Sequence, residues 1–587
     1  MLHIRPRTTN SPPVSSCPWS RPRVTCVALS ILAYLAFYAL AAPPVSSGQS
    51  PDRDLGAFRT FPYLVSPGDS SVVINWFTEA AKAGSLRVRS ASCDGPERRY
   101  KSSPTPIPAL EYTDAALTDT SRQSVRFANR NVKHSVRLSG LTSGCRYRYR
   151  VRQSGSSYQD SFRTGPGSMP DGAVRFVAFA DSETGPRGRT THRRWLPGAQ
   201  RPGSTGRPDS VQRYLLTEFE GFRRNLDVIR RRDPDFLLIS GDIVQGGGYQ
   251  RAWDELFLQT AGTFGQLFGS TPVVPALGNW ENSGGPYGGY DPEAVARGRA
   301  KFLAYFDAPP NNNLGYRGAY YRIDYGPVTV LTLDSSNGLP DSTDRDTNIN
   351  INASTYPADD LPDFNPGSDQ WNWVVEQLRT AREAGQVLFV QFHHPPYTAG
   401  YHSLPLTVPG SSGQAGVPIQ AYMPLFRKYG VAAVFSGHNE SFAHSIVGDV
   451  HFYDVGVAGD GFGIPLDTLN EQYAWWEDFL EKRPTVRRHQ DLFQNPHRIW
   501  SAHHDSGEIW NGAQLVDGGK HYGHLEVNVT PVSGREAYRV RLTPVYVFPV
   551  TDESGTVIRT ERRIYDDQSS FTVDTSGWPS VQSGSQP

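Results

Sequence analysis

Five apolar runs in this 587-residue chain each end at a residue whose side chain can bind a metal ion or a phosphate group. Runs this short and this apolar are typical of strands buried on both faces of an α/β sheet. Ligands gather beyond the carboxyl ends of such strands, so we expect these side chains to converge. A hydrophobic core needs no such groups after each strand, because burying an unpaired polar group is costly. The runs are VRFVAFA before Asp181, DFLLIS before Gly241 and Asp242, TPVVPALG before Asn279, QVLFVQF before His393 and His394, and VAAVFS before Gly437 and His438.

The bulk composition describes a folded chain with room for more than one core. Hydrophobic residues make up 38% and aromatic residues 12%, and the length favours about two to four domains. Lys and Arg together number 58, as do Asp and Glu, so the formal net charge is zero. Since no global basic field attracts nucleic acid, we expect no nucleic-acid partner.

The amino terminus carries the features of an export signal. Four arginines precede an apolar stretch from Val24 to Ala42, with small residues at positions 39–41 that fit a cleavage site. Residues 1–42 are interpreted as a signal peptide, or as a membrane anchor if the stretch is retained, because it is long for a signal. In both cases we expect the folded part to lie outside the cytoplasm, in a secreted, periplasmic or cell-surface protein.

Cysteine usage agrees with an oxidising compartment. Cys17 and Cys26 lie in the N-terminal segment that export would remove, which leaves Cys93 and Cys145. We expect these two to form a disulfide, since both lie in one small predicted domain. The alternative is a pair of buried thiols.

Residues 56–166 predict a small all-β sandwich. Short runs with alternating apolar residues are separated by turn residues, and no helical period is present. The end of this region, HSVRLSGLTSGCRYRYRV followed by SFRTGP, resembles the closing strands of fibronectin type III-like domains. Residues 165–172 would form the linker to the next domain.

Residues 172–548 predict an α/β domain. Strand-like runs alternate there with segments whose apolar residues are three and four positions apart, which predicts helices over 211–231, 291–306 and 369–384. We expect residues 549–587 to form a C-terminal tail. Three long segments, 185–210, 336–369 and 462–520, are expected to be insertions over the active face.

The motifs at the strand ends occur in the order D-x-E, G-D, G-N-x-E, V-x-x-H-x-P-x-Y and G-H-x-E. In this order they resemble the calcineurin-like metallophosphoesterase superfamily, and the all-β domain ahead of them is similar to that of the purple acid phosphatase branch. Each motif alone is weak, but five in order at strand ends are specific. The resemblance implies a β-sandwich followed by a four-layer α/β/β/α domain, in which helices flank two mixed β-sheets.

The resemblance also implies two divalent metal ions and hydrolysis of phosphate esters. Asp181 would hold the first metal and Asp242 would bridge both, since two neighbouring cations repel and need a shared carboxylate. Asn279, His393 and His438 would complete the second site, whose nitrogen and amide ligands suit zinc, manganese or ferrous iron. The alternative for these residues is a structural role, such as a capping aspartate or a loop histidine.

Three positions depart from the pattern of the family. Purple phosphatases carry an iron-binding tyrosine where this chain has Gln245, so we expect no visible charge-transfer band. Glu440 stands where the family has a second histidine, and Glu183 stands where relatives carry His or Gly. With oxygen ligands alone the first site would suit calcium, magnesium or manganese. The alternative is a decayed first site, with Glu440 in solvent.

Trp280 replaces a histidine that in the family helps to place the phosphoryl group and the leaving oxygen. Tryptophan cannot protonate a leaving group, so another residue must do so in an active enzyme. His394, beside the predicted ligand His393, and His444, beyond Glu440, are the candidates. Either could instead be a structural histidine.

Two functions from different classes follow from these residues. The first is an exported phosphoester hydrolase, acid phosphatase-like or a phosphodiesterase, in which the two metals activate a hydroxide that attacks phosphorus. The second is a catalytically weak metal-binding or surface-attachment protein on the same scaffold, which the changes at Trp280 and Glu440 motivate. A nucleic-acid processing enzyme is disfavoured by the zero net charge.

Overall fold

The computed structural model describes residues 54–118, 127–167, 172–183, 192–193, 195, 204–287, 292–335, 366–399, 417–460, 495–502 and 504–576. Residues from Asp52 onward form one compact unit. Within the described ranges, no helix is both long and apolar enough to cross a membrane. The expected export signal over residues 1–42 lies outside these ranges, so export stays a prediction.

The N-terminal part is a β-rich sandwich, as its alternating runs predict. A four-stranded antiparallel sheet in the order β4-β3-β7-β8 faces a second sheet that contains β1, β2, β6 and β5. Alternation along β3 and β7 turns Leu86, Val88, Tyr149 and Val151 inward against Trp76. Its fibronectin type III identity stays a prediction. The elements are β1 (Thr60–Val65), β2 (Val72–Thr78), β3 (Ser85–Ser90), β4 (Arg98–Lys101), β5 (Thr105–Pro106), α1 (Asp114–Thr118), β6 (Val132–Leu138), β7 (Arg146–Gln153) and β8 (Ser156–Arg163).

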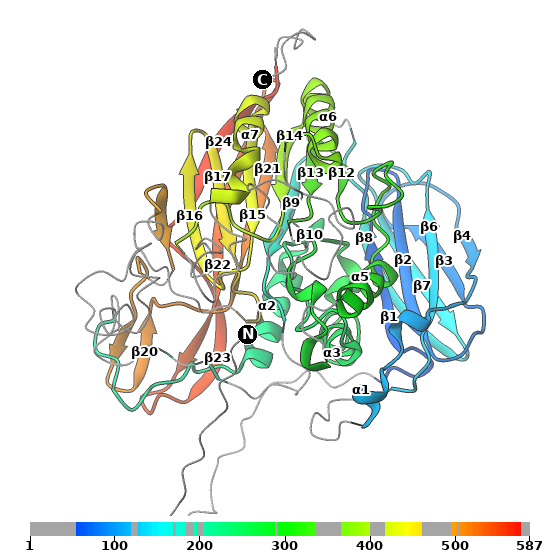
Figure 1. The fold of residues 1–587 in the computed structure, drawn as a ribbon, viewed down its shortest axis with the longest axis horizontal. Helices are drawn as coiled ribbons and strands as arrows, with labels where there is room; N and C mark the ends of the chain where they lie inside the picture. Colours follow the sequence, from blue (N-terminus) through cyan, green and yellow to red (C-terminus); the bar gives the residue numbers. More distant parts are fainter. Residues whose placement is uncertain are drawn as a thin grey trace, which may run out of the picture. The chain divides into compact units, whose positions relative to one another are not determined.

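The second sheet of the sandwich continues into the rest of the chain. One eleven-stranded sheet has the order β23-β22-β21-β9-β10-β11-β1-β2-β6-β5, with β24 beside β22 (Figure 1). Val65 of β1 pairs in parallel with Val273 of β11, so the predicted boundary near residue 170 is not a break in the sheet. The further strands are β9 (Val174–Phe179), β10 (Phe236–Ile239), β11 (Val273–Pro275), β21 (Gly523–Pro531), β22 (Ala537–Thr551), β23 (Val557–Ile564) and β24 (Ser569–Asp574).

A seven-stranded mixed sheet packs against the β9 region of the first. Its order is β12-β13-β14-β15-β17-β16-β18, and β13, β14, β15 and β17 run parallel. Phe176 of β9 contacts Phe389 of β14 and Phe435 of β15 edge to face, within the core between the two sheets. The strands are β12 (Tyr321–Tyr325), β13 (Val328–Thr332), β14 (Val387–Gln391), β15 (Val431–Ser436), β16 (Phe442–Val447), β17 (Val450–Val455) and β18 (Arg498–Ser501).

Helices cover the outer faces of both sheets, which gives the predicted four layers. α2, α3 and α5 pack on the eleven-stranded sheet, and α6 and α7 pack on the seven-stranded sheet (Figure 1). The predicted helix over 211–231 begins later than expected, because Thr217 and Glu220 form a capping box at its start. The helices are α2 (Glu218–Arg232), α3 (Gln250–Thr260), α4 (Leu267–Ser270), α5 (Pro292–Tyr305), α6 (Asp369–Glu383) and α7 (Met423–Tyr429).

The expected C-terminal tail over 549–587 is wrong for its described part. β22 runs on to Thr551, β23 pairs with it, and β24 pairs with the first half of β22. The sequence analysis did not predict the pairing of β23 and β24 with β22. The predicted insertions lie largely outside the described residues, but residues 495–520 carry β18, β19 (Ile509–Asn511) and β20 (Gln514–Asp517).

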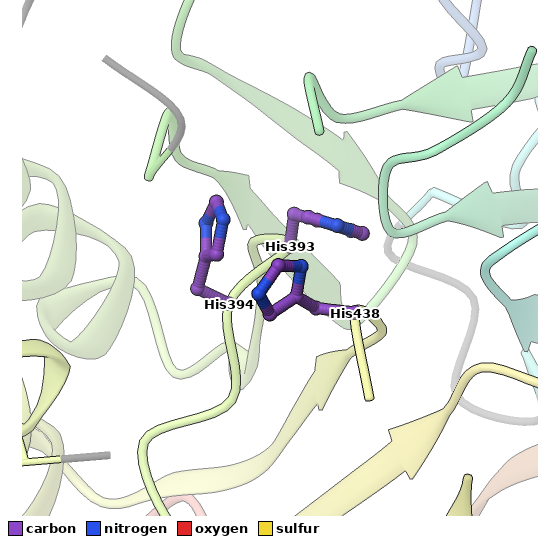
Figure 2. A group of neighbouring side chains, drawn as sticks. All are labelled: His393, His394 and His438. Atoms are coloured by element: carbon purple, nitrogen blue, oxygen red, sulfur yellow. The ribbon is translucent and has the colours of Figure 1, made fainter. Parts of the chain in front are cut away.

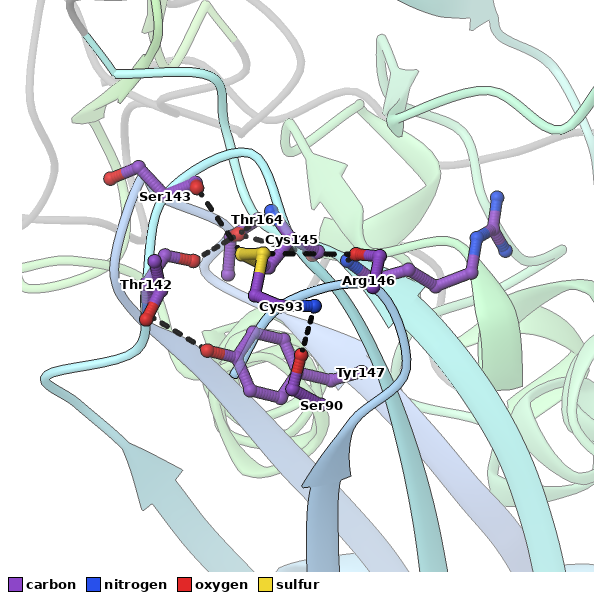
Figure 3. Close-up of a disulfide and its surroundings, with 9 residues drawn as sticks. Ser90, Cys93, Thr142, Ser143, Cys145, Arg146, Tyr147 and Thr164 are labelled. Carbon is purple, nitrogen blue, oxygen red and sulfur yellow. Dashed lines mark hydrogen bonds between the residues drawn. A yellow bond between two sulfur atoms is a disulfide. The ribbon is translucent and has the colours of Figure 1, made fainter. Parts of the chain in front are cut away.

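Cys93 and Cys145 form the predicted disulfide, which ties the segment after β3 to the start of β7 (Figure 3). The bridge is held by local hydrogen bonds. The Cys93 backbone N–H donates to Ser90 Oγ at 2.9 Å, and the Cys145 N–H donates to Thr164 Oγ1 at 3.0 Å. Cys145 is fully buried in the sandwich core.

Replacing both cysteines with serine is expected to lower the stability of the sandwich. The two cysteines are 52 residues apart, so the chain-entropy model assigns the bridge about 4 kcal/mol. Urea unfolding of the variant and of the parent protein, each with and without reductant, measures this loss. Reductant should destabilise the parent and leave the variant unchanged. Two reactive thiols in unreduced, denatured parent protein that lacks residues 1–42, and so lacks Cys17 and Cys26, would contradict the bridge.

Candidate metal centre

The five predicted strand ends meet at one place in the structure. Asp181, Asp242 and Asn279 follow the parallel strands β9, β10 and β11, and His393 and His438 follow β14 and β15 of the other sheet. All five side chains are buried. Parallel strands present their carboxyl ends at one edge, and two stacked sheets bring two such edges together. The predicted convergence is therefore confirmed, although it takes two sheets.

His393 is the centre of one group of ligand atoms. Its Nε2 lies 2.9 Å from Asp242 Oδ2 and 2.9 Å from Asn279 Oδ1. His438 Nδ1 also lies 2.9 Å from Asn279 Oδ1. The rings of His393, His394 and His438 are turned toward one another, and their ligand atoms lie within 4.8 Å (Figure 2). These atoms are close enough to share one cation.

The hydrogen bonding of His393 leaves Nε2 facing acceptors. Nδ1 donates to the Ser240 carbonyl oxygen at 2.9 Å, which fixes the tautomer of the neutral ring. Nε2 then presents a lone pair to a carboxylate oxygen and an amide oxygen, so a cation must lie between them. In the metal-free protein a proton serves: burial alone would lower the pKa of His393, but Asp242 and Asp181 raise it to about 9.

A second group consists of carboxylates. Burial, followed by Asp242, Asp181 and Glu440, raises the pKa of Glu183 well above its usual value, and burial raises that of Asp181 similarly. Glu183 Oε2 is buried without a hydrogen-bond partner among the described residues. Clustered buried carboxylates repel one another unless a proton or a metal ion neutralises them.

The backbone is strained at four of these positions. Asp181, Asp242, His438 and Glu440 have φ values of 52°, 49°, 79° and 47°. They are four of the eight described non-glycine residues with positive φ, a conformation that costs about 1–3 kcal/mol at each residue. Strain concentrated at one place in the fold marks a site where side-chain position matters more than stability.

Glu281 holds the Asp242 loop to the Asn279 loop. Its carboxylate accepts backbone N–H groups of Asp242, Ile243, Val244 and Gly278 at 2.7–3.3 Å, and the side chain is fully buried. Burial, with Asp242, raises the pKa of Glu281 to about 7. Glu281 is the last residue of the G-N-x-E motif, but the sequence analysis predicted no role for it.

Glycines of the motifs leave room for these ligands. A Cβ on Gly437 would lie 2.5 Å from Asp181 Oδ1, and a Cβ on Gly278 would lie 2.3 Å from Asp242 Oδ1. Both distances are far below van der Waals contact. The glycines of G-H and G-N are therefore required because a ligand from a neighbouring strand occupies the space of a side chain.

Residues 215–439 match the family model described as calcineurin-like phosphoesterase. This stretch of the chain is similar to calcineurin-like phosphoesterases. The protein named "Probable inactive purple acid phosphatase 27" of Arabidopsis thaliana is 22% identical over 344 residues, which are 57% of this chain and 47% of the relative. An uncharacterized protein of Mycobacterium tuberculosis is 24% identical over 351 residues, 58% of this chain and 56% of the relative. A solved purple acid phosphatase from yellow lupin seeds covers 87% of this chain and 74% of its own, at 14% identity and a TM-score of 0.49.

The family model and the Arabidopsis relative confirm the resemblance that the motifs carry. The chain spans about half the length of the curated relatives that it matches. The family model begins after Asp181 and Glu183 and ends just before Glu440, so these three members of the carboxylate group lie outside its limits.

The structure places two further charged residues, Asp454 and Lys520, at the carboxylate group. The sequence analysis did not predict either of them. Asp454, in β17, accepts a hydrogen bond from Ser441 Oγ at 2.5 Å, and burial raises its pKa to about 7. Lys520 donates from Nζ to the Glu440 carbonyl oxygen at 2.7 Å, and burial lowers its pKa to about 7 despite Glu440 and Asp454. Asp454 is a charged residue inside the buried strand β17, which was a usable signal, whereas nothing around Lys520 in the sequence singles it out.

Of the residues predicted to take part in catalysis, His394 and Trp280 lie at the site and His444 does not. His394 lies at the site: its Nδ1 is 2.8 Å from Ser335 Oγ, and its ring is 4.3 Å from that of His438. The Trp280 backbone N–H donates to Asp242 Oδ1 at 2.8 Å, so this position contributes through its backbone.

His444 is not brought to the site. Its Nδ1 lies 2.9 Å from Asp567 Oδ2 and its Nε2 lies 2.9 Å from His451 Nδ1, so the ring belongs to a buried network on β16 and β17. β16 carries the side chain away from the strand end at Glu440. These contacts therefore support a structural role for His444.

Metal binding to the phosphoesterase domain is expected to strengthen as pH rises. Burial raises the pKa values of Asp181, Glu183 and Asp454, that of Asp454 to about 7. In the metal-free protein their contribution to stability is therefore complete below the unfolded pKa near 4 and is lost as pH rises through the raised pKa of each group. Metal must displace these protons, so affinity should rise about tenfold per pH unit for each proton displaced. The measurement is the shift in Tm caused by Mn²⁺ or Zn²⁺ between about pH 5.5 and about pH 7.5, with EDTA-treated protein as control. A shift that does not change with pH would contradict proton displacement.

Proposed function

We propose that the protein is an exported, metal-dependent hydrolase of phosphate esters, acting on monoesters or diesters. The observation that carries the proposal is the meeting of Asp242, Asn279 and His393, where three acceptor atoms face one another and require a cation. A carboxylate, an amide and imidazoles form a donor set that suits divalent metals.

The donor atoms fit two neighbouring metal sites. Asp242, Asn279, His393 and His438 would hold the second metal, for which zinc, manganese or ferrous iron is suitable. Asp181, Glu183, Glu440 and the shared Asp242 would hold the first, for which calcium, magnesium or manganese is suitable. The buried Glu183 oxygen without a hydrogen bond supports this site. When bound, the metals would polarise the phosphoryl oxygens and lower the pKa of a coordinated water.

The residues of the chain would orient and exclude water. Ser240 fixes the His393 ring through its carbonyl oxygen, and the Trp280 N–H fixes the Asp242 carboxylate. Burial of the five strand-end side chains keeps bulk water from competing for their ligand atoms. His394 would supply a proton to the leaving oxygen, and Ser335 Oγ, 2.8 Å from Nδ1, would orient its ring.

A catalytically weak metal-binding protein is the second candidate. Lys520 favours it, because a buried ammonium group beside Glu440 and Asp454 supplies positive charge where the first metal would lie. The Arabidopsis relative is itself named inactive. In this reading the chain would bind one metal, at His393 and His438.

Elemental analysis together with two substrates separates the candidates. Purified protein, equilibrated with mixed divalent metals and desalted, is assayed with an aryl phosphate monoester and a diester. Two metals per chain with turnover of either ester support the hydrolase. One metal per chain and no turnover of either ester support the binding protein.

The variant Glu440→His is expected to shift the metal preference of the first site. An imidazole in place of a carboxylate should favour zinc or iron over calcium by roughly tenfold or more. Metal occupancy of both proteins after equilibration with calcium, manganese and zinc measures the shift, with Glu536→His at an exposed position as the control. Identical metal content in the variant and the parent would show that Glu440 is not a ligand.

A further inference from the structure

One face of the four-stranded sheet in the sandwich is covered by arginines. Along β3 and β7 every second residue is buried, and the residues between them point outward. The outward positions carry a dense group of guanidinium side chains, which we call the arginine face. Its members are Arg87, Arg89, Arg99, Arg148, Arg150 and Arg152.

Strand pairing places like charges directly opposite each other on this face. Arg87 is the cross-strand partner of both Arg99 and Arg150, and Arg89 is the partner of Arg148. Like charges in such positions destabilise a sheet, and opposite charges would stabilise it. A surface shaped by stability alone would therefore alternate the two signs here.

The arginine face has little acidic compensation. Glu97 pairs with Arg99 at 2.8 Å and reaches Arg87 at 4.0 Å. Arg89, Arg148 and Arg152 have no carboxylate oxygen within 4.0 Å among the described residues. Elsewhere in the chain, acids balance arginines, as Asp233 and Asp235 do for Arg163. Since the whole chain has zero formal charge, the face is a local excess.

The face is also hollowed. Arg87, Arg89, Arg148 and Arg150 line a groove of about 480 Å³, whose lining also includes Glu97 and, on β8, Gln159, Asp160 and Ser161. Arginines two residues apart on one strand are separated by about 7 Å, and neighbouring strands by about 5 Å. The guanidinium groups thus form a grid that is wider than a single anion and is matched by a chain of anions.

We propose that the arginine face binds an anionic polysaccharide, whose sulfate or phosphate groups are separated by the width of a sugar ring. Successive phosphates of inorganic polyphosphate share one oxygen and lie too close together for this grid. Single-stranded nucleic acid needs aromatic platforms for its bases, and the tyrosines of β7 point inward, where Tyr147 and Tyr149 are buried. Gln159 and Ser161 add an amide and a hydroxyl group for sugar hydroxyls.

The test compares two triple variants of the full chain. Arg87→Ser, Arg148→Ser and Arg150→Ser together empty the centre of the face. Arg539→Ser, Arg541→Ser and Arg559→Ser remove the same charge from exposed strand positions on β22 and β23. Binding to immobilised dextran sulfate, dextran phosphate and neutral dextran is measured over a range of salt concentrations.

We expect the first variant to lose roughly tenfold or more in affinity for the charged dextrans, with a weaker salt dependence, and the second to bind like the parent. Dextran sulfate and dextran phosphate distinguish the source of the anion. Equal losses in both variants would overturn the proposal, as would equal binding to neutral dextran. Tighter binding of polyphosphate or single-stranded DNA would also overturn it. Circular dichroism and urea unfolding show that each variant is folded. Because the assay measures binding, its outcome does not depend on enzymatic activity.

Discussion

Replacing Asp242 with alanine is expected to abolish phosphoester hydrolysis and to release both metals together. Asp242 Oδ2 lies 2.9 Å from His393 Nε2, and ligand atoms of Asp181, Asp242 and His393 lie within 4.8 Å of one another, so the carboxylate of Asp242 lies between the two groups of ligands. Without it, two cations would face each other without a shared anion. We expect turnover to fall by roughly a thousandfold or more.

Three controls sharpen this experiment. Asp242→Asn keeps the shape and removes the charge, so it should retain the fold and lose the metals. His438→Ala should also abolish hydrolysis, but it removes a ligand of the second site alone. Asp517→Ala removes an exposed carboxylate and should leave metal content unchanged. An Asp242→Ala protein with two metals and ordinary turnover would show that Asp242 is not the carboxylate that the two metals share.

Replacing Glu281 with alanine is expected to cost about 4 kcal/mol or more in stability and to empty the second metal site. Four backbone N–H groups lose a charged acceptor inside the protein, and each is left without a partner. The loops that carry Asp242 and Asn279 would then separate. Thermal unfolding and metal content are the two measurements.

The variant Glu281→Gln tests the hydrogen bonds without changing the volume. Each carboxylate oxygen accepts two of the four N–H groups, so an amide in either orientation turns an NH₂ group toward two donors. We expect about half of the alanine effect. Glu526→Gln is the matched control, since Glu526, on β21, is a buried carboxylate that pairs with Arg562 of β23. It should lower stability and keep the metal content. If Glu281→Gln matched the parent protein in both measurements, Glu281 would not be the clamp.

The parts of the fold that the sequence predicted are those with a local signal. Runs of four to six buried apolar residues ending in a polar ligand predicted β9, β10, β14 and β15, and hence Asp181, Asp242 and His393. The three- and four-residue period predicted α5 and α6. α3 was missed because all of its residues are buried, which removes the polar side of the period.

The remainder depended on pairing between distant segments. No pattern near Lys520 predicts its contact with Glu440. The position of His444 depends on Asp567, which lies in the segment expected to be a C-terminal tail. Likewise, β24 has an alternating pattern and β23 has none, and the pairing of both strands with β22 is set only by the sheet as a whole. Such information is in the tertiary contacts and not in any window of the sequence.

The position of β21 has a consequence for how the chain is made. β9, which precedes Asp181, is flanked on one side by β10 and on the other by β21, where Leu525 pairs with Ala178. The strands of the sandwich can pair early, and the disulfide between Cys93 and Cys145 can form early, because most of their contacts lie within residues 60–163. The backbone N–H and C=O groups on this edge of β9 stay unpaired until residue 525 has been made. High contact order of this kind slows folding and exposes strand edges. We therefore expect the nascent chain to need chaperone protection of β9 until its final strands leave the ribosome.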